Sequence, residues 1–546
     1  MSLRTPISIA LAMLASACGG SPPSEDVRAQ GQALAATAID PTPGASILAT
    51  SADGRWIAYR TDCDATTLRL TIELLDDATG SIAPLGQSAC RPGAIMPPPV
   101  FFSPDGRVVA FGLGAGVFEA RDARTGVVAP LSSAAHPLAG LAFSPDSRWL
   151  VVATGGPGGV ALDAWDASLA APVRIADRVL WNGFGPPAQS AVFSPGADRV
   201  MFLAAPPPGH PPRAGTLTVW DRLDGTSLAL ASGVPQGGYV VDDEWRRVAY
   251  LENASAQGGP GPYGGLRGEL AVGDPRGGPA VVVDAGLLAF PVGFARDALV
   301  YVTPDAGAAA TMTLKIADAD GASPPVVLDT GVFAPFLGAT PDVPVSPRGD
   351  RVAYARVGSG APALPEVRVA DTRTLDVVTV AAAAAPAPPA PPSGWIDGGR
   401  TLVFLQPSAS SPATGTLSAW SAADGSVTTL GAGVARTSVQ LDAWRGEVLF
   451  VDAFDATSGA GDLELWDARI ATTLPLGQNV RPESVRRSPG GEVVGFLSPP
   501  PATLTLALVG APFEDVVASN VTSYALGGLG RVVYTTPEGL YGADGL

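Results

Sequence analysis

Short apolar runs alternate with polar turns along most of this chain. Each run holds four to six hydrophobic residues, and a phrase close to Ser-Pro-Asp-Gly-Arg stands directly before it. The clearest copies begin at Ser103 and Ser144, ahead of the runs 108–111 and 149–152. Proline at the second position and glycine at the fourth suit a type I turn. The pattern therefore predicts a β-strand on each side of every turn.

The phrase recurs at a regular interval. Looser copies begin near Ser51, Ser194, Asp243, Phe294, Ser346, Asp397, Asp442, Ser488 and Gly527. This makes about eleven units, spaced roughly 40 to 53 residues apart. Within a unit a third strand often closes on Trp-Asp, as at 217–221, and a glycine turn leads to a fourth strand. Four antiparallel strands per repeat predict the blade of a β-propeller, and so an all-β fold.

The repeat resembles the TolB-type, WD-repeat-like β-propeller repeat. In that family a Ser-Pro-Asp-Gly turn joins the first two strands of a blade, and an Asp- and Gly-containing turn joins the last two. The resemblance covers nearly all of residues 32–546 and implies a propeller. It does not name a ligand, because function in such scaffolds resides in sites added to the repeated framework.

The two ends of the repeat array fit together. The chain stops after a third strand, and residues 33–39 look like a fourth strand with no blade before it. We expect this N-terminal strand to complete the last blade, which would pair an edge that is otherwise exposed. Eleven blades exceed the usual four to eight of one ring. The preferred arrangement is two packed propellers, residues 32–290 and 291–546, and the alternative is one large ring.

The first 31 residues predict export and anchoring. Arg4 and a short apolar stretch form a signal peptide, residues 1–17, that is too short to span a bilayer. The run from Leu14 to Cys18 resembles a bacterial lipobox, which implies a lipoprotein acylated on Cys18. Gly19 in place of Asp implies sorting to the outer membrane. Residues 18–31 are interpreted as a flexible tether, and ordinary signal-peptide cleavage nearby is the alternative.

Composition narrows the class of partner. The net charge is −17 and no basic patch is visible, which excludes a nucleic-acid-binding role. Besides Cys18 the chain has Cys63 and Cys90, and an exported chain enters a compartment that permits disulfides. Both follow strand ends on the same side of the first unit, so we expect them to pair, with a stabilisation of about 3–4 kcal/mol. The alternative is two free thiols.

The long, irregular connections lie on one side of the predicted blades. They join the second strand to the third and the fourth to the next blade, and long loops without structure of their own are where binding is expected. Within the loops 204–215 and 253–267 the candidate binding residues are His210, Arg213, Tyr263 and Arg267.

Signatures of catalysis, metal binding or cofactor binding are not found in the sequence. The only histidines are His136 and His210, which is not the spacing of a zinc site. A Gly-x-Ser-x-Gly elbow and a phosphate-binding loop are both missing. Asp-rich turns such as 318–321 are interpreted as hairpin turns, and the recurring Trp-Asp pairs as contacts between blades.

These observations predict a non-catalytic envelope lipoprotein without a cofactor. Its propeller would bind a protein, peptide or glycan through the long loops, and its lipid would bind the outer membrane. The alternative is a propeller enzyme, lyase- or glycosidase-like, with its site in the central pocket.

Overall fold

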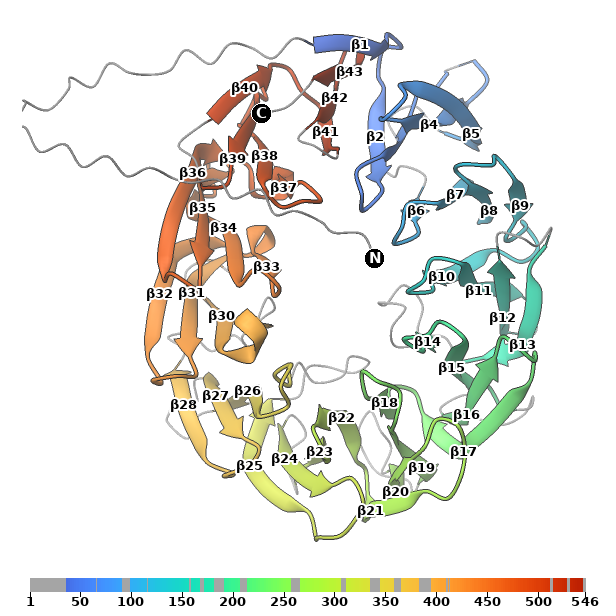
Figure 1. Ribbon diagram of the computed structural model, residues 1–546, viewed down its shortest axis with the longest axis vertical. Coiled ribbons are helices and arrows are strands. Elements are labelled where there is room, and N and C mark those ends of the chain that lie inside the picture. Colours follow the sequence, from blue (N-terminus) through green and yellow to red (C-terminus); the bar gives the residue numbers. More distant parts are fainter. Residues whose placement is uncertain are drawn as a thin grey trace, which may run out of the picture.

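The computed structural model of the chain is one ring of β-sheets around a central opening (Figure 1). It describes residues 36–64, 66–90, 99–114, 116–156, 159–166, 171–180, 191–206, 214–256, 266–305, 311–333, 344–357, 365–382, 394–408, 411, 413–510, 514–527 and 531–543. Within these ranges, seven four-stranded sheets and two larger sheets that each span two blades make eleven antiparallel blades. We number the blades 1 to 11 from the N-terminus and name their strands A to D from the inside outward.

Strands of the same position recur in every blade. The A strands are β2 (Ser46–Thr50), β6 (Val100–Phe102), β10 (Leu138–Phe143), β14 (Ala191–Phe193), β18 (Tyr239–Val241), β22 (Phe290–Ala295), β29 (Gly394–Ile396), β33 (Gln440–Asp442), β37 (Arg486–Arg487) and β41 (Ser523–Leu526). In blade 7 a single bridge from Val345 to Val352 takes the place of strand A. The B strands are β3 (Trp56–Arg60), β7 (Val108–Gly114), β11 (Trp149–Gly156), β15 (Arg199–Ala204), β19 (Val248–Ala256), β23 (Ala298–Pro304), β26 (Arg351–Val357), β30 (Thr401–Pro407), β34 (Glu447–Asp455), β38 (Val493–Leu497) and β42 (Val532–Thr536).

The outer half of each blade is equally regular. The C strands are β4 (Arg69–Asp76), β8 (Val117–Asp122), β12 (Gly159–Asp166), β16 (Ala214–Asp221), β20 (Leu266–Gly273), β24 (Thr311–Asp318), β27 (Pro365–Asp371), β31 (Thr414–Ser421), β35 (Ala460–Asp467), β39 (Leu504–Leu508) and β43 (Gly539–Ala543). The D strands are β5 (Ser81–Ala89), β9 (Val128–Pro130), β13 (Val173–Val179), β17 (Ser227–Pro235), β21 (Val281–Leu287), β25 (Val326–Phe333), β28 (Val377–Ala382), β32 (Val427–Ala435), β36 (Thr472–Val480), β40 (Glu514–Ala518) and β1 (Ala36–Asp40). Short 3-10 turns η2 (Asp397–Gly399), η3 (Arg436–Ser438) and η4 (Pro482–Ser484) follow strands in blades 8 and 9.

The N-terminal strand closes the ring, as predicted. β1 pairs antiparallel with β43 and becomes the D strand of blade 11 (Figure 1). A buried cluster then joins blade 1 to blade 11, with Ile57 and Leu75 on one side and Val533 and Leu540 on the other. The ends of the chain are thus held together by backbone pairing and by apolar contact.

The expectation of two packed propellers is wrong, since the structure has the single ring. Its predicted halves, residues 32–290 and 291–546, are two arcs of that ring. One hydrophobic cluster runs from Ala249 in blade 5 to Ala370 in blade 7, and Phe290 is buried within it. The repeat sets the strand order inside a blade, but the angle between blades depends on the side chains between neighbouring sheets. That angle is what decides how many blades close a ring.

The core consists of the B and C strands, covered on both sides by neighbouring blades. The runs that predicted strand B are almost entirely buried, as at Ile57, Val152 and Leu402. The tryptophans at the end of strand C are buried too, and each packs in a cluster with the preceding blade, as predicted for the Trp-Asp pairs. They are Trp165, Trp220, Trp420 and Trp466.

One position, where strand D of a blade faces strand B of the next, is occupied by polar pairs in some junctions and by apolar pairs in others. In three junctions an aspartate on strand D meets a tyrosine on strand B of the next blade. The hydroxyl groups of Tyr301 and Tyr354 donate to Asp284 (2.7 Å) and Asp329 (2.8 Å). The third pair closes the ring, where the Tyr59 hydroxyl lies 3.0 Å from Asp40 and also contacts Glu73. These junctions are polar although they are largely buried.

In other junctions the same position of strand D is a glycine, and the aromatic residue is a phenylalanine. A Cβ added at Gly477 would overlap the ring of Phe496, and one at Gly86 would lie 3.4 Å from Cε2 of Phe111. The missing side chain therefore makes room for the ring, which packs directly on the backbone of the neighbouring blade.

Candidate functional site

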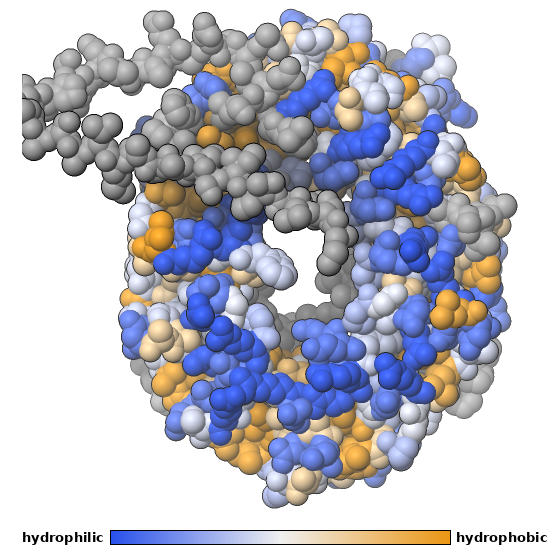
Figure 2. All heavy atoms as spheres, viewed as in Figure 1, coloured by the Kyte–Doolittle hydropathy of each residue, from blue (hydrophilic) through white to orange (hydrophobic). Residues whose placement is uncertain are grey.

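The strand order gives the ring two unlike faces. Turns between strands A and B and between C and D lie on one side, which we call the turn face, and the B–C and D–A connections lie on the other, the loop face. The view in Figure 2 shows an opening through the ring, with hydrophilic residues gathered around it and hydrophobic ones toward the outer rim. A ligand therefore has three places to bind: either face, or the opening.

The structure places one of the four predicted binding residues. Arg267 lies near the start of β20, is exposed, and pairs in register with Ser255 of β19 on the loop face. His210, Arg213 and Tyr263 lie outside the described residues, as does the predicted lipidation site Cys18. The binding role of the four residues stays a prediction.

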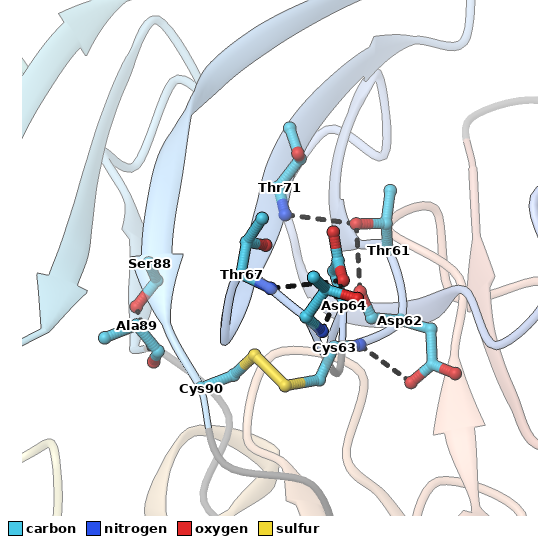
Figure 3. Close-up of a disulfide and its surroundings, with 10 residues drawn as sticks. Thr61, Asp62, Cys63, Asp64, Thr67, Thr71, Ser88, Ala89 and Cys90 are labelled. Atoms are coloured by element: carbon cyan, nitrogen blue, oxygen red, sulfur yellow. Dashed lines mark hydrogen bonds between the residues drawn. A yellow bond between two sulfur atoms is a disulfide. The ribbon is translucent and has the colours of Figure 1, made fainter.

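Cys63 and Cys90, the two cysteines predicted to pair, are joined by a disulfide on the loop face (Figure 3). Cys63 follows β3 and Cys90 follows β5, so the bond ties the B–C loop of blade 1 to the end of its strand D. The loop is also fixed by Asp64, whose side chain accepts hydrogen bonds from the N–H groups of Thr66 (2.7 Å) and Thr67 (3.3 Å). This part of the loop face is a braced surface.

The polar groups that could suggest catalysis or cation binding have local structural roles. His136 is exposed between β9 and β10, in a tight turn where its backbone N–H donates to the carbonyl of Ser133 at 3.0 Å. Asp320 and Asp455 each accept a backbone N–H two residues further on, from Ala322 (3.0 Å) and Thr457 (2.9 Å). In the part of the chain that the structure describes, no three His, Cys, Asp or Glu side chains form a metal-ligand group.

On the turn face, the Ser-Pro-Asp-Gly phrase is a self-contained hydrogen-bonded corner. In blade 2 the Ser103 hydroxyl accepts the N–H of Val108 (2.9 Å) and donates to Asp105 (2.8 Å), which in turn accepts the N–H of Arg107 (2.9 Å). Gly106 has φ +69°, and a Cβ there would lie 2.8 Å from the Cβ of Ser51 in the blade before. The turns therefore contact one another, and together they make a rim around the opening.

Arginines cover buried carboxylates along this rim. Arg55 pairs with Asp76 at 2.9 Å, and their side chains are 39% and 7% exposed. Arg107 and Asp122 repeat this arrangement at 2.8 Å, with 46% and 2% exposed. The hydrogen bond from Arg55 lowers the pKa of Asp76 against the opposing effect of burial. In both pairs the group that faces solvent is the guanidinium.

A small cavity opens between blades 5 and 6 on the same face. Its volume is about 370 Å³, and its walls include Arg247, Asp274, Asp297 and Asp320. The Arg247 guanidinium stacks over the ring of Phe294 at 5.2 Å and lies 3.5 Å from Asp297. Because charges of both signs line it and pair with each other, the cavity indicates no single class of ligand.

These features also decide the fold. Each blade has four antiparallel strands, and a Ser-Pro-Asp-Gly-like turn joins the first two. The fold is that of a β-propeller. No protein-family model matches the sequence, and no curated protein matches it.

Solved structures similar to this propeller include proteins of several kinds. TolB from Acinetobacter baumannii shares 15% identity at a TM-score of 0.24, over 56% of this chain and 78% of that one. An oligogalacturonate lyase in complex with manganese shares 15% at 0.36, over 72% and 96%. A eukaryotic initiation factor shares 11% at 0.43, over 85% and 98%. Similarity this weak concerns the fold alone, and propellers host many unrelated functions.

One surface residue of the propeller was missed in the sequence. Trp444 lies in the A–B turn of blade 9 and is 99% exposed. The sequence of that turn, 442–446, was interpreted only as another copy of the framework corner. A tryptophan in a turn that normally carries small or polar residues was the available signal.

Proposed function

We propose that this chain is a non-catalytic binding module of the bacterial cell envelope. Lipid on Cys18 would hold it at the outer membrane, and residues 18–31 would separate the ring from the bilayer. The lipobox-like run before Cys18 supports the anchor. The Cys63–Cys90 disulfide is in keeping with an oxidising compartment outside the cytoplasm.

The partner would be a protein, a peptide or a glycan, bound through the B–C and D–A loops. The observation that carries this proposal is the braced loop face of blade 1, where the disulfide and Asp64 fix a loop whose described residues are exposed or half-buried. A fixed loop loses less conformational entropy on binding than a free one. Exposed Arg267 of blade 5 lies on the same face and adds a charged contact.

The binding role is tested by photo-crosslinking in the native envelope. A photoreactive amino acid replaces Arg267 on the loop face or, as the control, Arg276, which is exposed in the C–D turn of the same blade on the opposite face. We expect a discrete adduct with one partner from position 267 and none from position 276. Equal labelling from both positions, or none from 267, would contradict the proposal. Turnover of an oligosaccharide by the purified mature chain would establish an enzyme instead.

The anchor is tested separately by fractionation. Cys18→Ser removes the thiol that would carry the lipid, so the mature chain should leave the membrane fraction and lose incorporation of a labelled fatty acid. Cys63→Ser is the matched control, since it removes a cysteine without touching the anchor. Membrane retention and labelling of the Cys18→Ser chain would exclude lipidation at this position.

A further inference from the structure

Trp444 differs from the other tryptophans in its exposure. Of the nine tryptophans that the structure describes, eight are at most 7% exposed, and they pack between or within blades. Trp444 is 99% exposed and is not part of the hydrophobic core. A partner that covers this indole would remove a large apolar area from water, which favours binding.

The turn that carries Trp444 is held in one conformation. The Asp442 carboxylate accepts the N–H groups of Trp444 (3.1 Å) and Arg445 (2.9 Å), and the Gly446 N–H donates to the Asp442 carbonyl at 2.9 Å. Burial pushes the pKa of Asp442 up, but the hydrogen bonds from Arg445 and the charges of Arg487 and Arg445 outweigh it and lower the pKa, so the carboxylate stays ionised at neutral pH. The indole is therefore presented by a rigid corner.

A second exposed apolar side chain belongs to the neighbouring turn of the same blade. Ile470, in the C–D turn, is 62% exposed. The two turns are linked, because the Ala468 N–H donates to the Gly446 carbonyl at 2.8 Å. Blade 9 thus exposes one aromatic and one aliphatic group on the turn face.

Three arginines stand in these two turns and in the A–B turn of blade 8. Arg400, Arg445 and Arg469 are 63%, 40% and 56% exposed. Four of the carboxylates that they pair with are less exposed, Asp397 at 28%, Asp442 at 24%, Asp467 at 12% and Glu447 at 8%, whereas Glu492, 3.9 Å from Arg445, is 69% exposed. At Arg400 and Arg469 the charge that a visiting group meets first is therefore positive, although the chain as a whole carries −17.

These residues form one patch across two blades. A Cβ at Gly446 would lie 3.4 Å from the Cβ of Asp397 in blade 8 and 3.8 Å from Cγ of Arg469 in blade 9. The turn also follows β33, an A strand on the edge of the central opening (Figure 1). The patch accordingly lies beside the mouth of the opening.

We propose that Arg400, Trp444, Arg445, Arg469 and Ile470 form a docking site for an acidic protein segment that carries a large apolar side chain. Tryptophan and arginine are the residues that most often dominate the affinity of protein interfaces. Guanidinium groups pair with carboxylates through two parallel hydrogen bonds. Ile470 favours a protein over a glycan, since an aliphatic side chain offers no ring face on which a sugar can stack.

This site goes beyond the proposed function and does not depend on it, because it lies on the face opposite the long loops. The two proposals are tested at different residues, so the failure of one can be told from the failure of the other. Crosslinking at residue 267 reports on the loop face, and substitutions at residue 444 report on the turn face. Either result stands without the other.

The test is selection of displayed random peptides against the mature chain, followed by affinity measurement with the enriched peptides in solution. We expect acidic peptides with a Trp, Phe or Leu. Their Kd should rise roughly 30-fold in Trp444→Ala. Arg400→Glu should weaken binding as well, and added salt should weaken it further.

Leu223→Ala is the matched control, because Leu223 is an 82% exposed apolar side chain in a C–D turn of the same face. It should leave the Kd unchanged, and both alanine variants should melt at the wild-type temperature. Enriched peptides without acidic residues would overturn the proposal, as would equal effects of the two variants. Binding of an anionic oligosaccharide that requires Trp444, in place of peptides, would overturn the choice of a protein partner.

Discussion

The junction between blades 6 and 7 and the junction between blades 9 and 10 join equivalent strands with opposite chemistry. Asp329 of β25 and Gly477 of β36 occupy the same register, since each pairs with the same position of its C strand, Leu314 and Leu463. Asp329 meets the hydroxyl of Tyr354, whereas Gly477 leaves room for the ring of Phe496. One backbone geometry therefore accepts either a buried polar network or a close aromatic contact.

The same pairing of residue types recurs at six of the eleven junctions. Aspartate at this register, at positions 40, 284 and 329, is always followed by a tyrosine in strand B of the next blade, at 59, 301 and 354. Glycine, at positions 86, 431 and 477, is always followed by a phenylalanine, at 111, 450 and 496. A phenol needs an acceptor and a phenyl ring needs space, which accounts for these six pairs. Alanine at the same register, at positions 176, 231, 381 and 518, precedes either a phenylalanine or a tyrosine.

The largest effect should come from removing the shared carboxylate of the polar junction. Asp329 is 10% exposed and lies 3.0 Å from Arg368 and 3.3 Å from Arg356, besides Tyr354. Asp329→Ala leaves buried charges without their partner and should cost about 3–5 kcal/mol in urea unfolding. Asp297→Ala, at a fully exposed aspartate that also faces an arginine, should cost less than about 0.5 kcal/mol. Similar losses in both variants would show that the network does not stabilise the junction.

A smaller loss is expected where the apolar junction is overfilled. In Gly477→Ala the new Cβ overlaps Phe496, which should cost about 1–3 kcal/mol by the same assay. Gly155→Ala in β11 is the control, since its Cβ meets nothing closer than 3.7 Å. Adding Phe496→Leu to Gly477→Ala should recover part of the loss. Strict additivity of the two substitutions would mean that the residues do not compete for space.

The smallest effect depends on pH. Burial, with the charge of Asp329, raises the pKa of Tyr354 above its usual value, so above about pH 10 the unfolded chain loses a proton that the folded chain keeps. That tyrosine therefore makes the fold less stable as the pH rises through this range. Tyr354→Phe should cost about 1 kcal/mol at pH 7 through the lost hydrogen bond, and the gap to wild type should narrow above pH 10. A gap that stays constant from pH 7 to 11 in thermal unfolding would refute this reasoning.

The sequence allowed the blades to be predicted more fully than the ring or the site. The spacing of the turns predicted eleven blades, and the phase of residues 33–39 predicted that β1 would complete the last one. The number of rings was mispredicted because it depends on side chains such as Asp284 and Tyr301, which meet between blades. The covariation of Asp with Tyr and of Gly with Phe was present in the sequence, but it needs the strand register to become visible.

The candidate site was predicted least well. The prediction favoured the long loops and so named His210, Arg213 and Tyr263, which lie outside the described residues. It did not consider the regular turns as binding sites. Exposure of Trp444 follows from its place in a turn that Asp442 already completes. Every copy of the A–B turn was taken to be purely structural, although the copy in blade 9 carries Trp444, which does not stabilise the turn or the core.

The central claim is that the chain closes into one ring of eleven blades, with Asp40 of the N-terminal strand meeting Tyr59 at the closing junction. Electron microscopy of the purified mature chain tests it most directly. Class averages viewed face-on should show a single ring with one central opening. Averages with two smaller rings side by side, each with its own centre, would contradict the account.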